Sequence, residues 1–170
     1  IKIVKQKKNG YGNALIEGIK ATKTKYCCII NADGSMNPKY LKRMLKICEK
    51  KDLIFTSRYQ KPGGGSEDDD IVTSVGNFFF TLFGNLFFKL NISDILFTYI
   101  LGKTKSFKKM KLSRHDFRIC VELPIKAKRL KFEYECIPSF ERVRIGGKKK
   151  VNPIKDGFLI LTEMIRLFFK

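Results

Sequence analysis

A carboxylate and an amide follow a short apolar segment early in the chain. Residues 26–30 (YCCII) lead into Asn31 and Asp33, and a helix is expected to begin after Asn37. Polar side chains that follow a strand gather at the carboxyl edge of an open α/β sheet, where such folds bind ligands. Carboxylate and amide oxygens beside bound phosphates are typical ligands of Mg²⁺ or Mn²⁺. The alternative is a polar turn in which Asn37 only caps the helix.

The size and charge of the chain limit what it can bind. It has 170 residues, 44% of them hydrophobic and 12% aromatic, which fits one globular domain with a core. Its formal net charge of +19 favours polyanionic partners: nucleic acid, anionic lipid or phosphorylated ligands. Charge alone does not choose among them.

Cysteine usage and the chain start give two further expectations. The five cysteines show no CxxC spacing, so we expect free thiols and a reducing, cytoplasmic setting. The sequence has no signal peptide and no run of 18 uncharged apolar residues. It begins at Ile1 inside an apparent strand, so we expect a fragment of a longer protein.

Strand and helix patterns alternate in the first third of the chain, and this order predicts an α/β fold with a parallel or mostly parallel sheet. Period-2 and short apolar runs predict strands, whereas apolar residues at helical spacing predict helices. The expected strands are 1–5, 26–30 and 52–56, and the expected helices are 11–22 and 37–49.

Residues 59–73 interrupt this alternation. A glycine-rich run at 62–66 precedes four acids at 67–70, and long loops of this kind are often lids or binding loops. Four consecutive acids cannot all point one way. We therefore expect a solvated loop here rather than a metal site.

An aromatic helix is expected at 72–90, with phenylalanines nearly all round it. It is either a core helix or a helix lying in the plane of a membrane surface. The rest of the chain predicts a strand at 95–101, a basic stretch at 103–114, a helix at 116–129 kinked at Pro124, a strand at 131–138, a flexible basic loop at 145–150 and a helix at 154–169.

The order and spacing of several segments, none specific alone, resemble the family 2 glycosyltransferases, especially the dolichyl- or polyprenyl-phosphate mannose (or glucose) synthase-like branch. The resemblance covers essentially all 170 residues. The segments are 8–14 (KNGYGNA) leading to Gly18, 31–35 (NADGS) with Pro38, 56–59 (TSRY), 63–64 (GG), 76–77 (GN), 93–94 (SD), 122–124 (ELP) with 126–127 (KA), and 142–148 (RVRIGGK) before 156–157 (DG).

This resemblance implies a GT-A fold that binds a nucleotide-diphosphate sugar. The family passes the sugar to an acceptor, in this branch usually a polyprenyl phosphate at a membrane surface. Asn31 and Asp33 match the metal motif of the family, so the implied cofactor is Mg²⁺ or Mn²⁺. Asp94 matches an acidic position near the acceptor. The glycine segment with Gly10, Gly12 and Asn13 is expected to contact the donor substrate.

The sequence departs from the family in two ways. Asn31 stands where the first aspartate of the metal motif is expected, so the cation should bind more weakly or depend on Asp33 and the diphosphate. The opening strands that grip the base and ribose in the family are not in the sequence. Residues 1–170 are therefore expected to form a partial catalytic domain lacking roughly 60–70 residues, about two βα units, and to be inactive alone.

The chemistry expected of the site is neutralisation of a leaving diphosphate. A cation at Asp33 would stabilise the diphosphate oxygens. Arg142, Arg144 and Lys148 could close over the phosphates on a glycine-hinged loop. A lipid phosphate acceptor is already ionised, so no strong base is needed, and the single His115 is expected at the surface or at a helix end.

Arg58 and Asp94 each have two interpretations. Arg58 is the candidate for holding the acceptor phosphate, or it forms a surface salt bridge. Asp94 is a candidate catalytic base in relatives with hydroxyl acceptors, a carboxylate that orients a lysine, or a turn cap.

Three functions remain open on the sequence. The main one is a metal-dependent transferase at the inner face of a membrane, because the phenylalanine helix and the basic stretch suit an anionic surface. A catalytically inactive relative is the second, on account of Asn31. A nucleic-acid-binding module is the third, although basic and aromatic runs are largely segregated and no docking motif is present.

Overall fold

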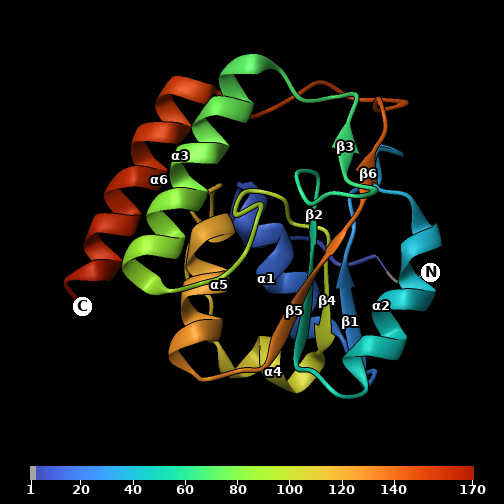
Figure 1. Ribbon diagram of the computed structural model, residues 1–170. Helices are drawn as coiled ribbons and strands as arrows, with labels where there is room; N and C mark the ends of the chain where they lie inside the picture. The colour runs from blue at the N-terminus through green and yellow to red at the C-terminus, as the bar shows by residue number, and fades with distance from the viewer. Residues whose placement is uncertain (1–2) are drawn as a thin grey trace.

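A computed structural model describes residues 3–170, and its centre is a four-stranded sheet with helices on both faces (Figure 1). β4 is antiparallel to both of its neighbours, whereas β2 and β5 are parallel. β1, β2 and β5 thus run in one direction, and β4, which runs in the opposite direction, makes the sheet mixed. The strands, in sheet order, are β1 (Tyr26–Ile29), β4 (Ile100–Lys103), β2 (Leu53–Ser57) and β5 (Tyr134–Pro138).

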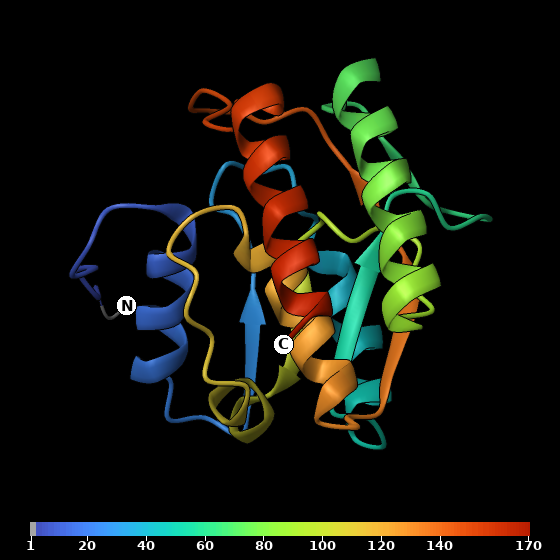
Figure 2. The same cartoon turned by 90° about the vertical axis from the view of Figure 1, so that its left-hand side faces the viewer.

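The helices cover the two faces unequally. One face carries η1 (Pro38–Tyr40) and α2 (Leu41–Cys48). The other carries α1 (Tyr11–Ala21), α4 (Thr104–Lys109) and α5 (Ile119–Arg129), with α3 (Ile71–Phe88) and α6 (Pro153–Phe168) packed side by side outside α5. Figure 2 shows α3 and α6 together in front of the sheet.

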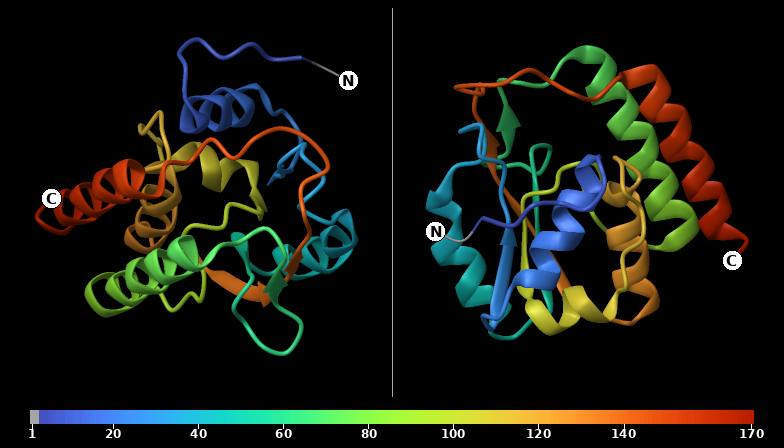
Figure 3. Two further views of the ribbon diagram at one scale, coloured as in Figure 1. Left: turned by 90° about the horizontal axis from the view of Figure 1, so that it is seen from above. Right: turned by 180° about the vertical axis from the view of Figure 1, so that it is seen from behind.

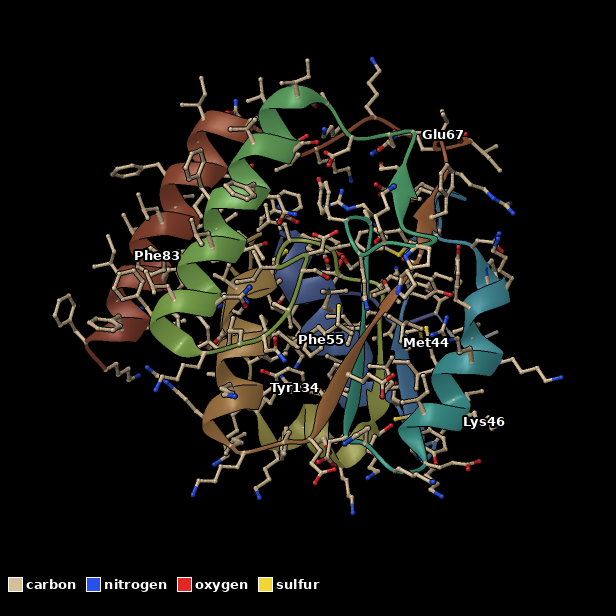
Figure 4. All side chains as sticks on the ribbon, viewed as in Figure 1. Met44, Lys46, Phe55, Glu67, Phe83 and Tyr134 are labelled. Atoms are coloured by element: carbon tan, nitrogen blue, oxygen red, sulfur yellow. The ribbon has the colours of Figure 1, made fainter. Side chains whose placement is uncertain are left out.

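Alternation along β2 builds a core on each side of the sheet. Leu53 and Phe55 pack on the α5 side, and Ile54 packs with Met44 under α2. Successive side chains of a strand point to opposite faces, so a fully buried strand needs apolar residues throughout. Figure 4 shows Met44 pointing from α2 toward the sheet and Lys46 pointing away.

Most of the predicted elements are confirmed with small shifts of their ends. The Asn37 side chain accepts a hydrogen bond from the Lys39 N–H (3.0 Å), so it caps the helix as expected. The predictions at 11–22, 26–30, 52–56, 72–90, 116–129, 131–138 and 154–169 correspond to α1, β1, β2, α3, α5, β5 and α6.

Two strand predictions are wrong in part. Residues 3–5 of the predicted strand 1–5 are not in a strand, and Ile3 is 85% exposed; residues 1–2 lie outside the described part. The strand predicted at 95–101 is β4, which starts at Ile100. The N–H groups of Ile95 and Leu96 donate instead to side chains of α3, because Thr81 and Asn77 accept them at 3.2 and 3.1 Å.

The long loop at 59–73 contains a short strand that the sequence did not predict. β3 (Gly65–Ser66) pairs in parallel with β6 (Phe140–Glu141), and Glu141 also bridges to Met36. A Cβ at Gly65 would lie 2.8 Å from the Phe140 ring, so a larger residue there would force this ring to move. This small sheet brings the loops after β1, β2 and β5 together at one end of the molecule.

Candidate active site

A cleft of about 830 Å³ opens at the carboxyl ends of β1 and β2. Open α/β sheets bind ligands at this edge. Its walls come from the loop after β1, the acidic loop (residues 67–70), residues 96–98 before β4, and the basic segment (residues 142–150) after β6. In Figure 1 the basic segment crosses the top of the molecule from β6 to α6.

Asp33 lines the cleft and is held by its own turn. One carboxylate oxygen, Oδ1, accepts hydrogen bonds from the N–H and the hydroxyl of Ser35 (3.0 and 2.8 Å). Oδ2 lies 4.0 Å from a guanidinium nitrogen of Arg144. Gly34 adopts φ 84° against Ile145, and the Ile145 N–H donates to the Asp33 carbonyl (2.7 Å). The carboxylate is therefore fixed beneath the basic segment.

Asn31 lies beside Asp33 in the same wall, and Tyr11 contacts it. The Tyr11 hydroxyl donates to Asn31 Oδ1 at 3.4 Å and also bonds to the Thr98 hydroxyl. The Tyr11 ring stacks on Phe117, with centroids 5.1 Å apart. Burial raises the pKa of the Tyr11 phenol well above its usual value, so it stays a donor. Tyr11 was not among the site residues expected from the sequence, although the motif at 8–14 contains it.

Arg58 and Asp94 form one buried ion pair at the floor of the cleft. Arg58 Nε and Nη2 donate to the two oxygens of Asp94 at 2.7 and 3.0 Å, and Asn77 donates to Asp94 as well (2.9 Å). Arg58 also pairs with Glu141 at 3.2 Å and with Asp69 at 3.5 Å. Arg58 lines the cleft and the buried Asp94 lies beneath it. Asp94 therefore holds the Arg58 guanidinium in place at the floor of the cleft. The substrate and base roles remain predictions.

The three basic candidates on the basic segment differ in their placement. Arg144 and Lys148 line the cleft, whereas exposed Arg142 is tied to the wall by its backbone, whose N–H donates to the Ser35 carbonyl (3.0 Å). Arg144 donates to Asp68 through two nitrogens. The expectation of a merely solvated acidic loop is therefore wrong for Asp68, because its carboxylate pairs with an arginine across the cleft.

Gly10 is the residue of the glycine segment that lines the cleft, and Gly12 and Asn13 hold the segment in place through packing and hydrogen bonds. A Cβ on Gly12 would lie 2.2 Å from the Arg114 carbonyl oxygen, so this position needs glycine for close packing. Asn13 is buried, and its side chain donates to the Lys8 carbonyl (2.6 Å) while its N–H donates to the carbonyl of His115 (3.0 Å). His115 itself is exposed, as expected.

The residues at Asp33 fit a cation that is shared with a ligand. Within residues 3–170, no three His, Cys, Asp or Glu side chains converge as a metal cluster would. Mg²⁺ commonly takes one or two carboxylates and completes its shell with water and substrate phosphates. The Asp33 carboxylate and the neighbouring Asn31 amide supply such a partial set of hard oxygen donors.

α3 buries its polar and small residues, and its phenylalanines divide between the core, where Phe80, Phe83 and Phe88 pack, and the exposed outer side. Asn77, Thr81 and Gly84 are buried, whereas Phe78 and Phe79 are 63% and 60% exposed. In the part of the chain that the structure describes, α3 is long and apolar enough to cross a membrane, which is weak evidence on its own. The interpretation of α3 as an ordinary core helix accounts for only its inner side.

Solved structures share this fold. A mycobacterial protein matches with a TM-score of 0.69 at 11% identity, over 94% of this chain and 52% of that one. Glucosyl-3-phosphoglycerate synthase from Mycobacterium tuberculosis, in complex with Mn²⁺, UDP-glucose and phosphoglyceric acid, matches with a TM-score of 0.63 at 14% identity, over 95% and 55%. The chain thus has a GT-A-like α/β fold and spans about half the length of these structures.

The family follows from the sequence match. The chain belongs to glycosyl transferase family 2, whose model matches residues 1–111. No curated protein matches it. The matched residues include β1, β2, β4 and the loop that carries Asn31 and Asp33.

Proposed function

We propose that this chain is part of a metal-dependent glycosyltransferase that moves a sugar from a nucleotide-diphosphate sugar to an acceptor. The observation that carries the proposal is the position of Asp33 and the basic segment on one cleft at the carboxyl edge of the sheet. Family membership supports the reaction class. The fold neighbour solved with Mn²⁺ and UDP-glucose supports the donor and the metal.

In this proposal each group of the cleft has a defined task. Asp33, assisted by the Asn31 amide, holds Mg²⁺ or Mn²⁺, which would supply Lewis-acid stabilisation of the diphosphate when bound. Arg144 and Lys148 face the cleft and offset the negative charge that grows on the leaving diphosphate. Tyr11 orients the Asn31 amide through its hydroxyl.

The proposed acceptor is a polyprenyl phosphate, and the protein is proposed to lie on the inner, cytoplasmic face of a membrane. Support comes from the resemblance to the polyprenyl-phosphate branch and from the exposed phenylalanines of α3. A phosphate acceptor is ionised at neutral pH and needs no general base. That agrees with a cleft whose buried Asp94 already accepts hydrogen bonds on both oxygens.

The test compares Asp33→Asn with Glu49→Gln, which removes an exposed carboxylate at the end of α2. In the full-length protein that contains this chain, Asp33→Asn should lower transfer of labelled sugar to polyprenyl phosphate by at least about 100-fold, because the cation loses its charged ligand. Glu49→Gln should leave transfer unchanged.

Calorimetry with Mn²⁺ and pyrophosphate separates this proposal from the inactive relative. Mn²⁺ binding that depends on Asp33, together with turnover, supports the transferase. Binding without turnover on any nucleotide-diphosphate sugar would favour the inactive relative. Normal transfer by Asp33→Asn would contradict the proposed metal site.

A further inference from the structure

The acidic loop and the basic segment are joined across the cleft by two ion pairs. Asp68 accepts from Arg144 in a two-nitrogen arrangement, with Nε to Oδ1 at 3.1 Å, and Lys149 Nζ lies 2.6 Å from a carboxylate oxygen of Asp70. Bidentate guanidinium–carboxylate pairs are among the strongest charge-assisted hydrogen bonds. The pair with Arg144 lowers the pKa of Asp68 below its usual range, so this carboxylate is ionised at neutral pH.

The acidic loop is the fixed partner of the two. Asp70 caps α3 by accepting from the Thr73 N–H (2.8 Å), and Asp69 accepts from the Ser74 hydroxyl (3.0 Å). The Ser66 hydroxyl accepts from the backbone N–H groups of Asp68 and Asp69 at 3.2 and 3.0 Å. The loop therefore presents Asp68 from a position that its own hydrogen bonds define.

The basic segment packs loosely at its glycines, between the ion pairs of Arg144 and Lys149. A Cβ at Gly146 or Gly147 would meet nothing within 4 Å. Residues 145–150 are exposed, and they join β6 to α6 across the top of the molecule (Figures 1 and 3). Arg144 itself stands between two carboxylates, bonded to Asp68 and 4.0 Å from Asp33.

We propose that Asp68 is a positioning residue that acts as an internal counter-anion, holding Arg144 over the cleft until phosphate oxygens of the ligand replace it. This inference rests on the proposed function. The guanidinium fork fits a carboxylate and a phosphate equally well, so the exchange needs only a small movement of one side chain. Asp70 holds Lys149 in the same way at the outer end of the segment.

The exchange has a definite energetic consequence. Asp68 keeps the basic segment ordered, but the ligand must displace it and therefore binds less tightly than it would to a free Arg144. Loss of Asp68 should strengthen binding of a small phosphate ligand and loosen the segment in its absence. Simple structural damage to the cleft would weaken binding, so the direction of the change separates the two explanations.

The experiment compares Asp68→Asn with Glu67→Gln. Both variants remove one negative charge from the acidic loop, but the Glu67 side chain is exposed and makes no ion pair among residues 3–170 (Figure 4). The probe is inorganic pyrophosphate with Mg²⁺, measured by titration calorimetry. We expect Asp68→Asn to bind pyrophosphate about 2- to 5-fold more tightly than Glu67→Gln and the unchanged protein, as fits a partly exposed pair.

Trypsin cleavage after residues 148–150 is the second measurement, because it needs no ligand. Asp68→Asn should be cut several-fold faster than Glu67→Gln. Asp70→Asn should show a smaller increase, since asparagine keeps the helix cap while it loses the charge that holds Lys149. Pyrophosphate should slow cleavage in the unchanged protein.

The outcomes that would overturn the proposal are distinct from failure of the proposed function. Equal pyrophosphate affinity and equal cleavage in Asp68→Asn and Glu67→Gln would show that Asp68 does not act as a counter-anion. Weaker pyrophosphate binding by Asp68→Asn would also overturn it and make Asp68 part of the binding surface. An unchanged protein that binds no pyrophosphate would contradict the phosphate site itself.

Discussion

Arg58 is one cation that faces three carboxylates, and this imbalance bears on how the cleft binds phosphate. Asp94, Glu141 and Asp69 lie 2.7, 3.2 and 3.5 Å from its guanidinium nitrogens. Burial disfavours the charge, but the charge and hydrogen bonds of Asp94 together with the charge of Glu141 outweigh burial and raise the pKa of Arg58. The cluster keeps an excess of negative charge beside the cleft. Arg144 and the lysines at 148–150, which also line the cleft, oppose this negative charge, and the proposed metal would add to their attraction for a diphosphate.

Substitution of Asp94 should destabilise the protein, because it strips Arg58 of its closest partner. Asp94→Ala is expected to cost about 3–5 kcal/mol of unfolding free energy, as for other broken buried pairs. Asp94→Asn keeps one acceptor oxygen for Asn77 or Arg58 and should cost less. Urea unfolding followed by circular dichroism measures both. Equal midpoints for Asp94→Ala and the unchanged protein would show that the pair contributes nothing.

The sequence predicted which residues belong to the site better than it predicted their burial and their partners. Asp33 was expected at the rim of the cleft, and it lies there because a strand followed by an Asx-type turn fixes its position. The sequence could not predict the burial of Arg58, since its partners come from the segment between α3 and β4, the acidic loop and β6, far apart in sequence. The same holds for Asp68 and Arg144, which are paired across the cleft only once β3 and β6 have met.

At the scale of elements, α5 anchors the loop that supports α1. The Glu122 side chain is fully buried and accepts from the Ser113 hydroxyl (2.7 Å), while Lys126 lies 2.7 Å away. This fixes residues 113–116, against which Gly12 and Asn13 pack. α5 therefore places the glycine segment of the cleft through one carboxylate.

Glu122 should make stability depend on pH. Burial raises its pKa, but hydrogen bonds from Lys126 and Ser113 outweigh burial, and the net pKa lies below the usual value. The charged form thus stabilises the fold above about pH 4.3, and this contribution is lost as the pH falls through the lower, folded-state value. Glu122→Gln should cost about 1–3 kcal/mol at pH 7 and less at pH 3.5.

Urea unfolding at the two pH values measures this change. Glu133→Gln, which removes an exposed carboxylate, is the control, and it should change the free energy of unfolding by the same small amount at both pH values. A cost of Glu122→Gln that does not shrink at pH 3.5 would contradict the role of the carboxylate charge.

Helices and strands were predicted correctly where caps and hydrophobic periodicity within the element itself indicate them. Caps and periodicity located η1 and α2, since the Asn37 side chain caps η1 and α2 follows directly after it. β4 was misplaced because residues 95–99 are mostly apolar and mostly buried without being in a strand, and the N–H groups of Ile95 and Leu96 donate to α3 side chains. The reversed direction of β4 depends on non-local pairing with β1 and β2, which no local pattern encodes.

For the whole molecule, the outer face of α3 and α6 is the largest departure from an ordinary soluble surface. Phe78 on α3 and Phe158 on α6 are 63% and 68% exposed, and the two helices lie side by side in Figure 2. The chain also carries a net charge of +19. Aromatic residues on a basic protein suit an anionic bilayer surface, since each nearby lysine or arginine adds about 1 kcal/mol.

Co-sedimentation with vesicles tests this proposed surface. The unchanged protein should bind vesicles that contain phosphatidylserine, and Phe78→Ser with Phe158→Ser should weaken binding about tenfold through lost apolar burial. Leu45→Ser on α2, at the opposite face of the sheet, is the matched control and should bind normally. Unchanged vesicle binding by the phenylalanine double variant would exclude this face as the membrane-binding surface.

The place of β4 between β1 and β2 has a consequence for biosynthesis. β1 and β2 do not pair with each other, so this sheet cannot form around them before β4 at residues 100–103 has been synthesised. Until residues 100–103 are synthesised, the edge of β1 and the edge of β2 that β4 later covers stay unpaired, and each could pair with a foreign strand. Translation pauses or chaperones that act in that interval would therefore affect the yield of native protein.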